Sequence, residues 1–467
     1  MNTSVVLITL IFYKILLIGI GFWASKRMKS QEDMLLGGRS LGPLVGAISY
    51  SASAASAWTL LGMSGLAYTI GLPAIWIAAG AVLGSALAWI WVAPRMRRFS
   101  KEHKILTLTD FLSFGADGPL KKAIVLLSSL IILVSFIFYI ASQFQGAGNT
   151  FALTFDMQAS ESILLGGVVI LLYTMLGGFW AVSLTDTLQG ILMFLAAIIM
   201  PVAAFITLSD MGGFWVSLEK IYEPSALTLS GQSMGLALVG LIIGNLAVGL
   251  GALGQPHLQA RFMAMKDDKA INQAAILGIG WYAFVFFGMC LLGLMGHAIL
   301  PDLNNPENIF FELTAVLFPS VLGGIILAAV LSAVMSTADS MLLVAAGIFS
   351  HDLGLSQRFK DREVLVSRLA IVAVTALSIW VAIQFEASIF NRVLFAWNAL
   401  GAAFGPLIIM RLAGVDFRAR GAFLAIASGF GCAVYLFSQP NMPGDWLERL
   451  APFILGLVIL YGFRRRS

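Results

Sequence analysis

Polar side chains recur within apolar stretches of the sequence, in types and spacings that suit the binding of a small cation. The stretch SYSASAASAW, residues 49–58, consists mainly of serine and alanine. In SAVMSTADSMLL, residues 332–343, helical spacing groups on adjacent turns of one face Ser332, Ser336, Asp339 and Ser340, with Thr337 beside them. Hydroxyls, carboxylates and carbonyl oxygens are the hard ligands that small cations prefer. These two stretches therefore predict a cation site.

Ionisable residues also lie within apolar runs, where a charge is costly and commonly has a function. Asp186 lies in SLTDTLQ, near the start of one run, and Asp339 lies within another. We expect both aspartates to handle a cation. Lys14 lies in the first apolar run. We expect it either to reach toward the membrane surface or to be paired.

The composition is that of an integral membrane protein. Of 467 residues, 59% are hydrophobic and 11% are charged, whereas soluble domains carry about 25% charged residues. The four histidines lie in four separate segments, and no catalytic motif accompanies them, which disfavours a membrane enzyme. The net charge of +4 belongs to loops at one membrane surface, and nothing suggests a nucleic-acid partner.

Thirteen apolar runs are long enough to predict membrane-spanning helices, and together they make an all-α, single transmembrane domain over residues 1–467. The predicted spans are 4–25, 43–71, 73–94, 122–151, 161–178, 182–208, 234–256, 271–298, 319–349, 364–385, 389–411, 419–437 and 447–463.

The distribution of cations predicts the orientation of these helices. Lys and Arg gather in alternate loops, and the loops between them hold only Lys220, Arg392 and Arg449. Because cytoplasmic loops carry the excess of Lys and Arg, we expect the N-terminus outside and the C-terminus in the cytoplasm. The predicted location is the inner (plasma) membrane, which the chain crosses many times.

Two of the predicted helices are interrupted. The first contains residues 49–58, and the second contains GNLAVGLGALGQPH, residues 244–257, whose four glycines and Pro256 disfavour a regular helix. Two broken helices that lie five helices apart indicate a transporter built from inverted repeats. We expect five-plus-five helices, one repeat over about 43–208 and the other over about 234–411, with peripheral helices at 4–25 and 419–463. Open helix ends offer carbonyls to a cation and N–H groups to a carboxylate.

Six motifs, in order along the chain, resemble bacterial sodium/proline symporters, which belong to the solute:sodium symporter family. They are LLGGRSLGP (35–43), the broken helix ending at Trp58, LYTMLGGFWAVSLTDTLQ (172–189), GQPHLQARFMA (254–264), LSAVMSTADS (331–340) and FAWNALGAAFGP (395–406).

This resemblance implies a set of site residues. The main sodium site is similar to a cage formed by the carbonyls of Ala52, Ala55 and Ala333 and the hydroxyls of Ser336 and Thr337. A second cation site or exit route resembles one formed by Ser336 together with Asp186, Asp339 and Ser340. The solute would lie beside Ser56, Trp58, Tyr139 and the break from Val248 to Ala252.

The sequence departs from the proline transporters at three of these places. They carry an acidic residue where Ala54 stands and aromatic residues where Val248 and Ala252 stand. The loss of both rings predicts a wider pocket and makes a solute larger than proline plausible. Asp339 would offset the missing acid from the opposite wall.

The leading hypothesis is therefore sodium-coupled symport of a small solute, proline or a related neutral amino acid, with sodium as the co-transported ion and membrane lipid as the surrounding partner. Three alternatives stay open: proton coupling through Asp186 and Asp339, a larger solute, and a transporter-like sensor module. The oligomeric state is not indicated by the sequence.

Overall fold

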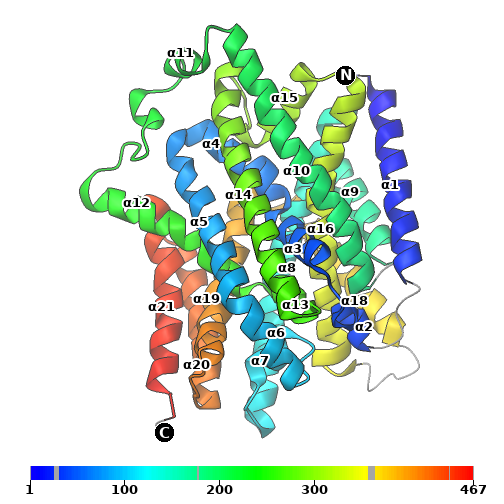
Figure 1. The fold of residues 1–467 in the computed structure, drawn as a ribbon, viewed down its shortest axis with the longest axis vertical. Coiled ribbons are helices and arrows are strands. Elements are labelled where there is room, and N and C mark those ends of the chain that lie inside the picture. The colour runs from blue at the N-terminus through cyan, green and yellow to red at the C-terminus, as the bar shows by residue number, and fades with distance from the viewer. Residues whose placement is uncertain are drawn as a thin grey trace.

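The computed structural model is a bundle of helices whose two chain ends lie at opposite ends of its long axis (Figure 1). It describes residues 2–25, 31–175, 178–355, 363–385, 387–440 and 442–465. Across these residues there is no strand, and extended backbone forms two isolated bridges, Leu41 with Met265 and Phe417 with Arg464. The predicted all-α class is confirmed for this part of the chain.

The bounds of the α-helices follow the apolar runs closely. Those in the first half are α1 (Thr3–Ser25), α2 (Gln31–Leu36), α3 (Pro43–Ala57), α4 (Ser64–Ile70), α5 (Ile75–Leu87), α6 (Ala93–Glu102), α7 (Leu108–Ser113), α8 (Gly118–Phe155), α9 (Ala159–Thr174), α10 (Phe179–Asp210) and α11 (Phe214–Glu219). Those in the second half are α12 (Gly235–Ala247), α13 (Pro256–Ala264), α14 (Asp268–Ile299), α15 (Ile309–Leu317), α16 (Ser320–Gly347), α18 (Glu363–Gln384), α19 (Ile389–Leu412), α20 (Ala419–Phe437) and α21 (Trp446–Gly462).

Short helices of other types join or extend these elements. Among the described residues the π-helices are η2 (Trp58–Met63), η4 (Ala88–Val92) and η8 (Ile348–Asp352). The 3-10 helices are η1 (Gly37–Arg39), η3 (Leu72–Ala74), η5 (Pro224–Leu227), η6 (Val248–Gly254), η7 (Pro306–Asn308) and η10 (Pro443–Asp445).

Eleven helices within the described residues are long and apolar enough to cross a membrane. The other two predicted spans fall on α9, whose apolar stretch is shorter, and on α21, which has 17 residues. Thirteen spans therefore stay a prediction. Two loops that hold many of the cations used for the orientation, at 26–30 and 356–362, lie outside the described residues, as do residues 176 and 177 within the predicted span 161–178.

Both predicted helix interruptions are confirmed. The first is at Ser56, whose φ of 53° and ψ of −173° leave the helical region at the end of α3. A positive φ is rare for a residue with a side chain, and π-helical η2 follows it directly. The second interruption is the glycine-rich 3-10 segment η6, which separates α12 from α13.

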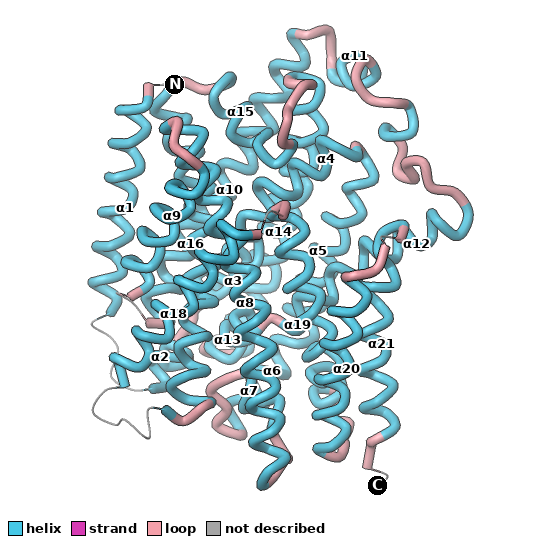
Figure 2. Tube along the Cα trace, turned by 180° about the vertical axis from the view of Figure 1, so that it is seen from behind, coloured by secondary structure: helices cyan, strands magenta, loops and turns pink. Residues whose placement is uncertain are grey.

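Helix α3 and the segment η6 lie inside the bundle, and α1 lies at its edge. Helix α3 packs against α10, α14 and α16, and η6 packs against α5 and α19. Gly84 lets α5 approach η6 closely, because a Cβ at Gly84 would lie 2.2 Å from the carbonyl oxygen of Gly249 in η6. Helices α1 and α21 lie at opposite edges of the bundle (Figures 1 and 2), and α1 turns Phe12, 71% exposed, outward.

Candidate functional site

Helices α3 and α16 meet through the oxygen atoms that were predicted to hold sodium. The Ser336 hydroxyl lies 3.2 Å from the carbonyl oxygens of both Ala52 and Ala333. The Thr337 hydroxyl donates to the carbonyls of Ser53, at 2.9 Å, and Ala333, at 3.1 Å. All of these residues are fully buried. Two hydroxyls and carbonyls from two helices thus converge at one buried point, where their lone pairs suit a small cation.

The remaining predicted cage residue, Ala55, lies one turn further along α3. Its carbonyl accepts hydrogen bonds from the Thr59 hydroxyl and the Trp58 backbone N–H. The structure therefore brings together Ala52, Ala333, Ser336 and Thr337, and the part of Ala55 in a cage stays a prediction.

Asp186 lies at the centre of a buried polar cluster near this point. Its Oδ2 atom accepts hydrogen bonds from the hydroxyls of Ser49, at 2.8 Å, and Ser53, at 3.2 Å. The same oxygen lies 2.6 Å from Nη2 of Arg261. Asp186 and Arg261 are 0% and 1% exposed, so the ion pair is screened little by water.

Arg261 is a site residue that the sequence analysis missed, because it was treated only as a cation of an inner loop. It lies in α13, directly after the broken helix, and its guanidinium also donates to the Ser340 hydroxyl at 2.6 Å and the His257 carbonyl at 2.7 Å. The available signal was an arginine four residues after His257, within the motif GQPHLQARFMA.

The predicted second cation site has its residues grouped around Ser340. The Ser340 hydroxyl donates to the Ser336 carbonyl at 2.7 Å and lies 3.1 Å from the Ser53 hydroxyl. Asp339 is fully buried, and its Oδ1 atom accepts from the Ser340 hydroxyl at 3.4 Å. Asp186, Ser336, Asp339 and Ser340 thus form one cluster, to which Arg261 contributes a positive charge.

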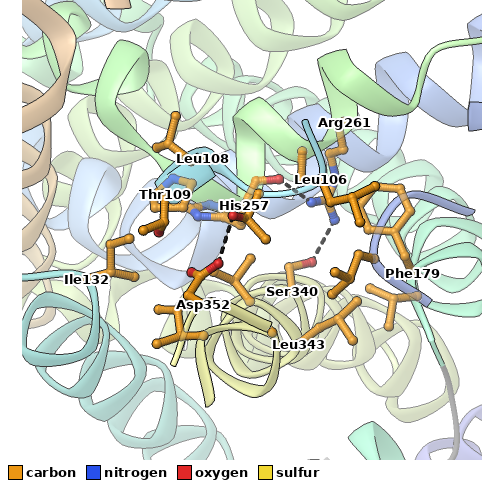
Figure 3. Close-up of a pocket in the computed structure, with 18 residues that line it drawn as sticks. Leu106, Leu108, Thr109, Ile132, Phe179, His257, Arg261, Ser340, Leu343 and Asp352 are labelled. Carbon is orange, nitrogen blue, oxygen red and sulfur yellow. Dashed lines mark hydrogen bonds between the residues drawn. The ribbon is translucent and has the colours of Figure 1, made fainter. Parts of the chain in front are cut away.

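A cavity leads to this cluster from the end of the bundle where α6 and α7 lie. Figure 3 shows Arg261 and Ser340 pointing toward one another on one side of the cavity, with Asp352 and Thr109 further along it. His257 also lines the cavity. The ion pair of Arg261 with Asp186 therefore lies at the buried end of this cavity.

An aspartate–histidine contact ties α7 to η8 beside Thr109 and Asp352, which line the cavity. The His351 Nε2 atom lies 3.0 Å from Asp110 Oδ2, and Asp110 also accepts from the backbone N–H groups of Leu106 and Thr107. Burial disfavours the charged carboxylate, but the hydrogen bond and charge of His351 and the two N–H groups outweigh it and lower the pKa of Asp110.

Three of the residues predicted to contact the solute meet at the first interruption. Ser56 provides the break itself, and the Tyr139 hydroxyl lies 3.5 Å from its Oγ atom. Trp58 follows in η2, and its ring centroid lies 5.2 Å from that of Phe286. Gln143, which the sequence analysis did not single out, accepts from the Ala57 N–H at 3.0 Å. The Gln143 side chain therefore satisfies a backbone N–H group at this break.

The second interruption is closed by the ring of Trp397 from α19. Its Nε1 atom donates to the Val248 carbonyl at 2.8 Å, and a Cβ on Gly251 would lie 2.0 Å from Cδ1 of the ring. The Trp397 and Trp58 centroids are 6.4 Å apart. Val248 and Ala252 are 1% and 4% exposed. A tryptophan from another helix therefore packs at the break where the two family rings are missing.

At the opposite end of the bundle, Glu307 of η7 joins the start of α19. Its two carboxylate oxygens accept from the backbone N–H groups of Ile389, at 3.0 Å, and Phe390, at 2.9 Å. The Phe390 ring centroid lies 5.9 Å from that of Trp58. Burial raises the pKa of Glu307, while the two N–H groups and Arg392 act in the other direction.

Comparison with known sequences gives matches over nearly the whole chain. A family model described as the sodium:solute symporter family matches residues 34–429. The high-affinity proline transporter PutP of Bacillus subtilis (strain 168) is 34% identical over 451 residues, which are 95% of this chain and 94% of the relative. Sodium/proline symporter 2 of Staphylococcus saprophyticus is 34% identical over 435 residues, which are 90% of this chain and 84% of the relative. These relatives are transporters rather than enzymes.

Comparison with solved structures shows the fold. A Na+-coupled sialic acid symporter, in a substrate-bound outward-open state, is 17% identical with a TM-score of 0.81 over 99% of both chains. Mhp1, a nucleobase-cation-symport-1 family transporter in a closed conformation, is 12% identical with a TM-score of 0.60 over 92% of this chain and 93% of Mhp1.

Proposed function

Because the chain belongs to the sodium:solute symporter family, we propose that it carries proline or a related neutral amino acid into the cell together with sodium. The convergence of hydroxyl and carbonyl oxygens between α3 and α16 is the observation that carries this proposal. Relatives 34% identical over most of the chain are named for sodium and proline or for proline alone. The solute is therefore proposed from the likeness to these relatives. The cation is proposed from the same likeness and also from the geometry of the oxygen atoms between α3 and α16.

In this proposal the carbonyls of Ala52, Ala55 and Ala333 and the hydroxyls of Ser336 and Thr337 hold the transported sodium. The ligands come from both α3 and α16, so bound sodium would hold the two helices in one relative position. Release would follow when they separate. The binding energy of the ion thus favours one conformation over the other, as coupling requires.

The cluster of Asp186, Asp339 and Ser340 serves as a second cation site or as the exit route. The cavity that reaches Arg261 and Ser340 from the α7 end of the bundle supports an exit route there. The solved structure of the sialic acid symporter reveals a novel Na+-site in that protein, and its fold matches the fold of this chain. A second cation, if one is carried, is therefore expected at this cluster.

The solute lies between the two interruptions, beside Ser56, Trp58, Tyr139, Val248 and Ala252. Its carboxylate would accept hydrogen bonds from N–H groups freed at the breaks, and its apolar part would contact the rings of Trp58 and Trp397. Glu307 and Phe390 would close the outer side of the site, and Arg261 with Asp186 would close the inner side. Transport then requires these two closures to open in turn.

The proposed architecture is thirteen spans, with repeats over about 43–208 and 234–411 related by inversion. Helix α6, which carries Arg95, Arg97, Arg98 and Lys101, lies toward the end of the bundle where the C-terminus lies (Figure 1). We assign that end to the cytoplasm, since inner loops carry the cations. The N-terminus is then outside the cell membrane.

Uptake by the purified chain in proteoliposomes tests the function. Labelled proline should accumulate when an inward sodium gradient is imposed, and should not when choline replaces sodium. Accumulation driven by a proton gradient without sodium would favour the proton-coupled alternative. Absence of proline uptake and of proline counter-flow would contradict the proposed solute, and a screen of larger amino acids under the same gradient would follow.

A further inference from the structure

The buried charges near the proposed second cation site are not equally paired. Asp186 and Asp339 are both 0% exposed. Asp186 forms its ion pair with Arg261, whereas Asp339 accepts one long hydrogen bond, from Ser340 at 3.4 Å. Its Oδ2 atom has no hydrogen-bond partner among the described residues. A carboxylate buried in this way requires a nearby positive charge to remain ionised.

Lys14 of α1 is placed to supply that charge. Helix α1 packs along α16, where the Lys14 ammonium contacts the sulfur of Met335 and the neighbouring Tyr13 hydroxyl is hydrogen-bonded to Ser332. Met335 precedes Asp339 by one helical turn, so the two side chains share one face of α16. The Lys14 ammonium therefore contacts the face of α16 that carries Asp339.

The position of Lys14 along α1 excludes the simpler role of reaching toward the membrane surface. It lies at the middle of α1, which runs from Thr3 to Ser25. At a rise of 1.5 Å per residue, either end of the helix is about 16 Å away, which is more than a lysine side chain spans. Residues on other faces of α1, such as Phe12 and Ile15, are exposed, whereas Lys14 faces α16.

We propose that Lys14 is a tethered cation that neutralises Asp339, so that the second site admits no sodium and one sodium accompanies each solute. This inference rests on the proposed function of sodium-coupled uptake. Arg261 and Lys14 together balance Asp186 and Asp339, and a sodium ion added between them would bring an uncompensated positive charge into the membrane interior. The main cage carries hydroxyls and carbonyls without a carboxylate, so its sodium does not compete with Lys14.

The coupling ratio of the full chain in proteoliposomes tests the proposal, with labelled proline as the probe. The ratio is obtained from the membrane potential at which net proline flux reverses under fixed sodium and proline gradients. We expect one sodium per proline for the wild type and for Lys14→Arg, which keeps the charge. We expect two for Lys14→Met, with a sigmoidal dependence of uptake on sodium. A wild-type ratio of two, or an unchanged ratio in Lys14→Met, would overturn the proposal.

Failure of the proposed function gives a different result, because the wild type would then show no sodium-driven proline flux at all. Lys14→Met also leaves Asp339 unpaired and risks poor folding, so a second variant combines it with Asp339→Asn. We expect this double variant to melt at a higher temperature than Lys14→Met and to return to one sodium per proline. A double variant no more stable than Lys14→Met would contradict the pairing.

Discussion

Arg261 Nη2 and Asp186 Oδ2 lie 2.6 Å apart and join α13 to α10 inside the bundle. Arg261 lines the cavity, so in the proposed transport cycle the stability of the pair bears on release of the solute and the ion. Its two charges lie in separate repeats of the proposed architecture. In the proposed transport cycle, opening toward the cytoplasm requires this contact to break.

Removing one charge of the Arg261–Asp186 ion pair is expected to destabilise the protein more than removing both charges. Arg261→Gln leaves Asp186 buried without its counter-charge, which costs about 3–5 kcal/mol. The double variant Arg261→Gln with Asp186→Asn leaves no charge unpaired and should regain much of the melting temperature in detergent. We expect proline uptake to stay low in both, since the closure is lost in both. A double variant less stable than Arg261→Gln would contradict this account.

The proposed sodium cage gives a second prediction. Ser336→Ala and Thr337→Ala each remove a hydroxyl oxygen and should raise the sodium concentration for half-maximal uptake by about tenfold, which corresponds to about 1.4 kcal/mol. Thr150→Ala is the matched control, because Thr150 makes a similar hydrogen bond to the Gly146 carbonyl in α8. If sodium dependence is unchanged in both cage variants, the cation binds elsewhere.

The interrupted helices and the cation-binding face of residues 332–343 could be predicted from local sequence, whereas the carbonyls of the proposed cage were implied by the family resemblance. Four glycines and Pro256 disfavour a helix wherever they occur, and the spacing of Ser336, Asp339 and Ser340 fixes their common face. These are properties of short segments. The structure adds the partner across the interface, such as the Ala52 carbonyl for Ser336.

Arg261 and Trp397 could not be predicted in the same way. An arginine just after an apolar run resembles the cations of an inner loop, and periodicity does not tell which charge is taken out of water. The Trp397 contact with Val248 joins residues 149 positions apart in the sequence, and no local sequence pattern predicts a contact between residues so far apart. The prediction of a wider pocket rested on Val248 and Ala252 alone. It did not include the Trp397 ring, which packs at this break from α19.

Glu307 gives a prediction for the outer closure. Glu307→Ala removes two charge-assisted hydrogen bonds to the start of α19, each worth about 1.5–3 kcal/mol, and frees Phe390 from its position beside Trp58. We expect proline uptake to fall by at least tenfold while the amount of folded protein is retained. Glu312→Gln in the following helix α15 is the control and should transport normally. If Glu307→Ala takes up proline at the wild-type rate, Glu307 has no part in the proposed outer closure.

Asp110 gives a pH-dependent prediction. Because its pKa is lowered in the folded protein, its contribution to stability is present above its ordinary value of about 3.9 and is lost as the pH falls through the lower folded value. Asp110→Asn should therefore lower the melting temperature at pH 7, and the difference from wild type should shrink below about pH 4. Asp117→Asn is the control, since Asp117 precedes α8 without a side-chain capping bond.

The last prediction concerns the two missing rings at the second break. Val248→Trp with Ala252→Tyr would restore the aromatic residues of the proline transporters. Trp397 already lies at this break, however, hydrogen-bonded to the Val248 carbonyl and in contact with Gly251. Extra volume in a well-packed site costs about 1–3 kcal/mol, so we expect the double variant to bind proline at least about tenfold more weakly than the wild type.

Proline affinity in a third variant shows whether Trp397 fills the same space. An aromatic ring removes about 150–250 Å² from water when it is buried, and at about 25 cal/mol per Å² even a quarter of that area is near 1–1.5 kcal/mol. Trp397→Ala alone should therefore weaken proline binding about tenfold. Adding Trp397→Ala to the double variant should relieve the crowding and recover part of the affinity, because one ring replaces another. If instead Val248→Trp with Ala252→Tyr tightens proline binding while Trp397 is intact, the space at the break is open, and a solute larger than proline becomes the better assignment.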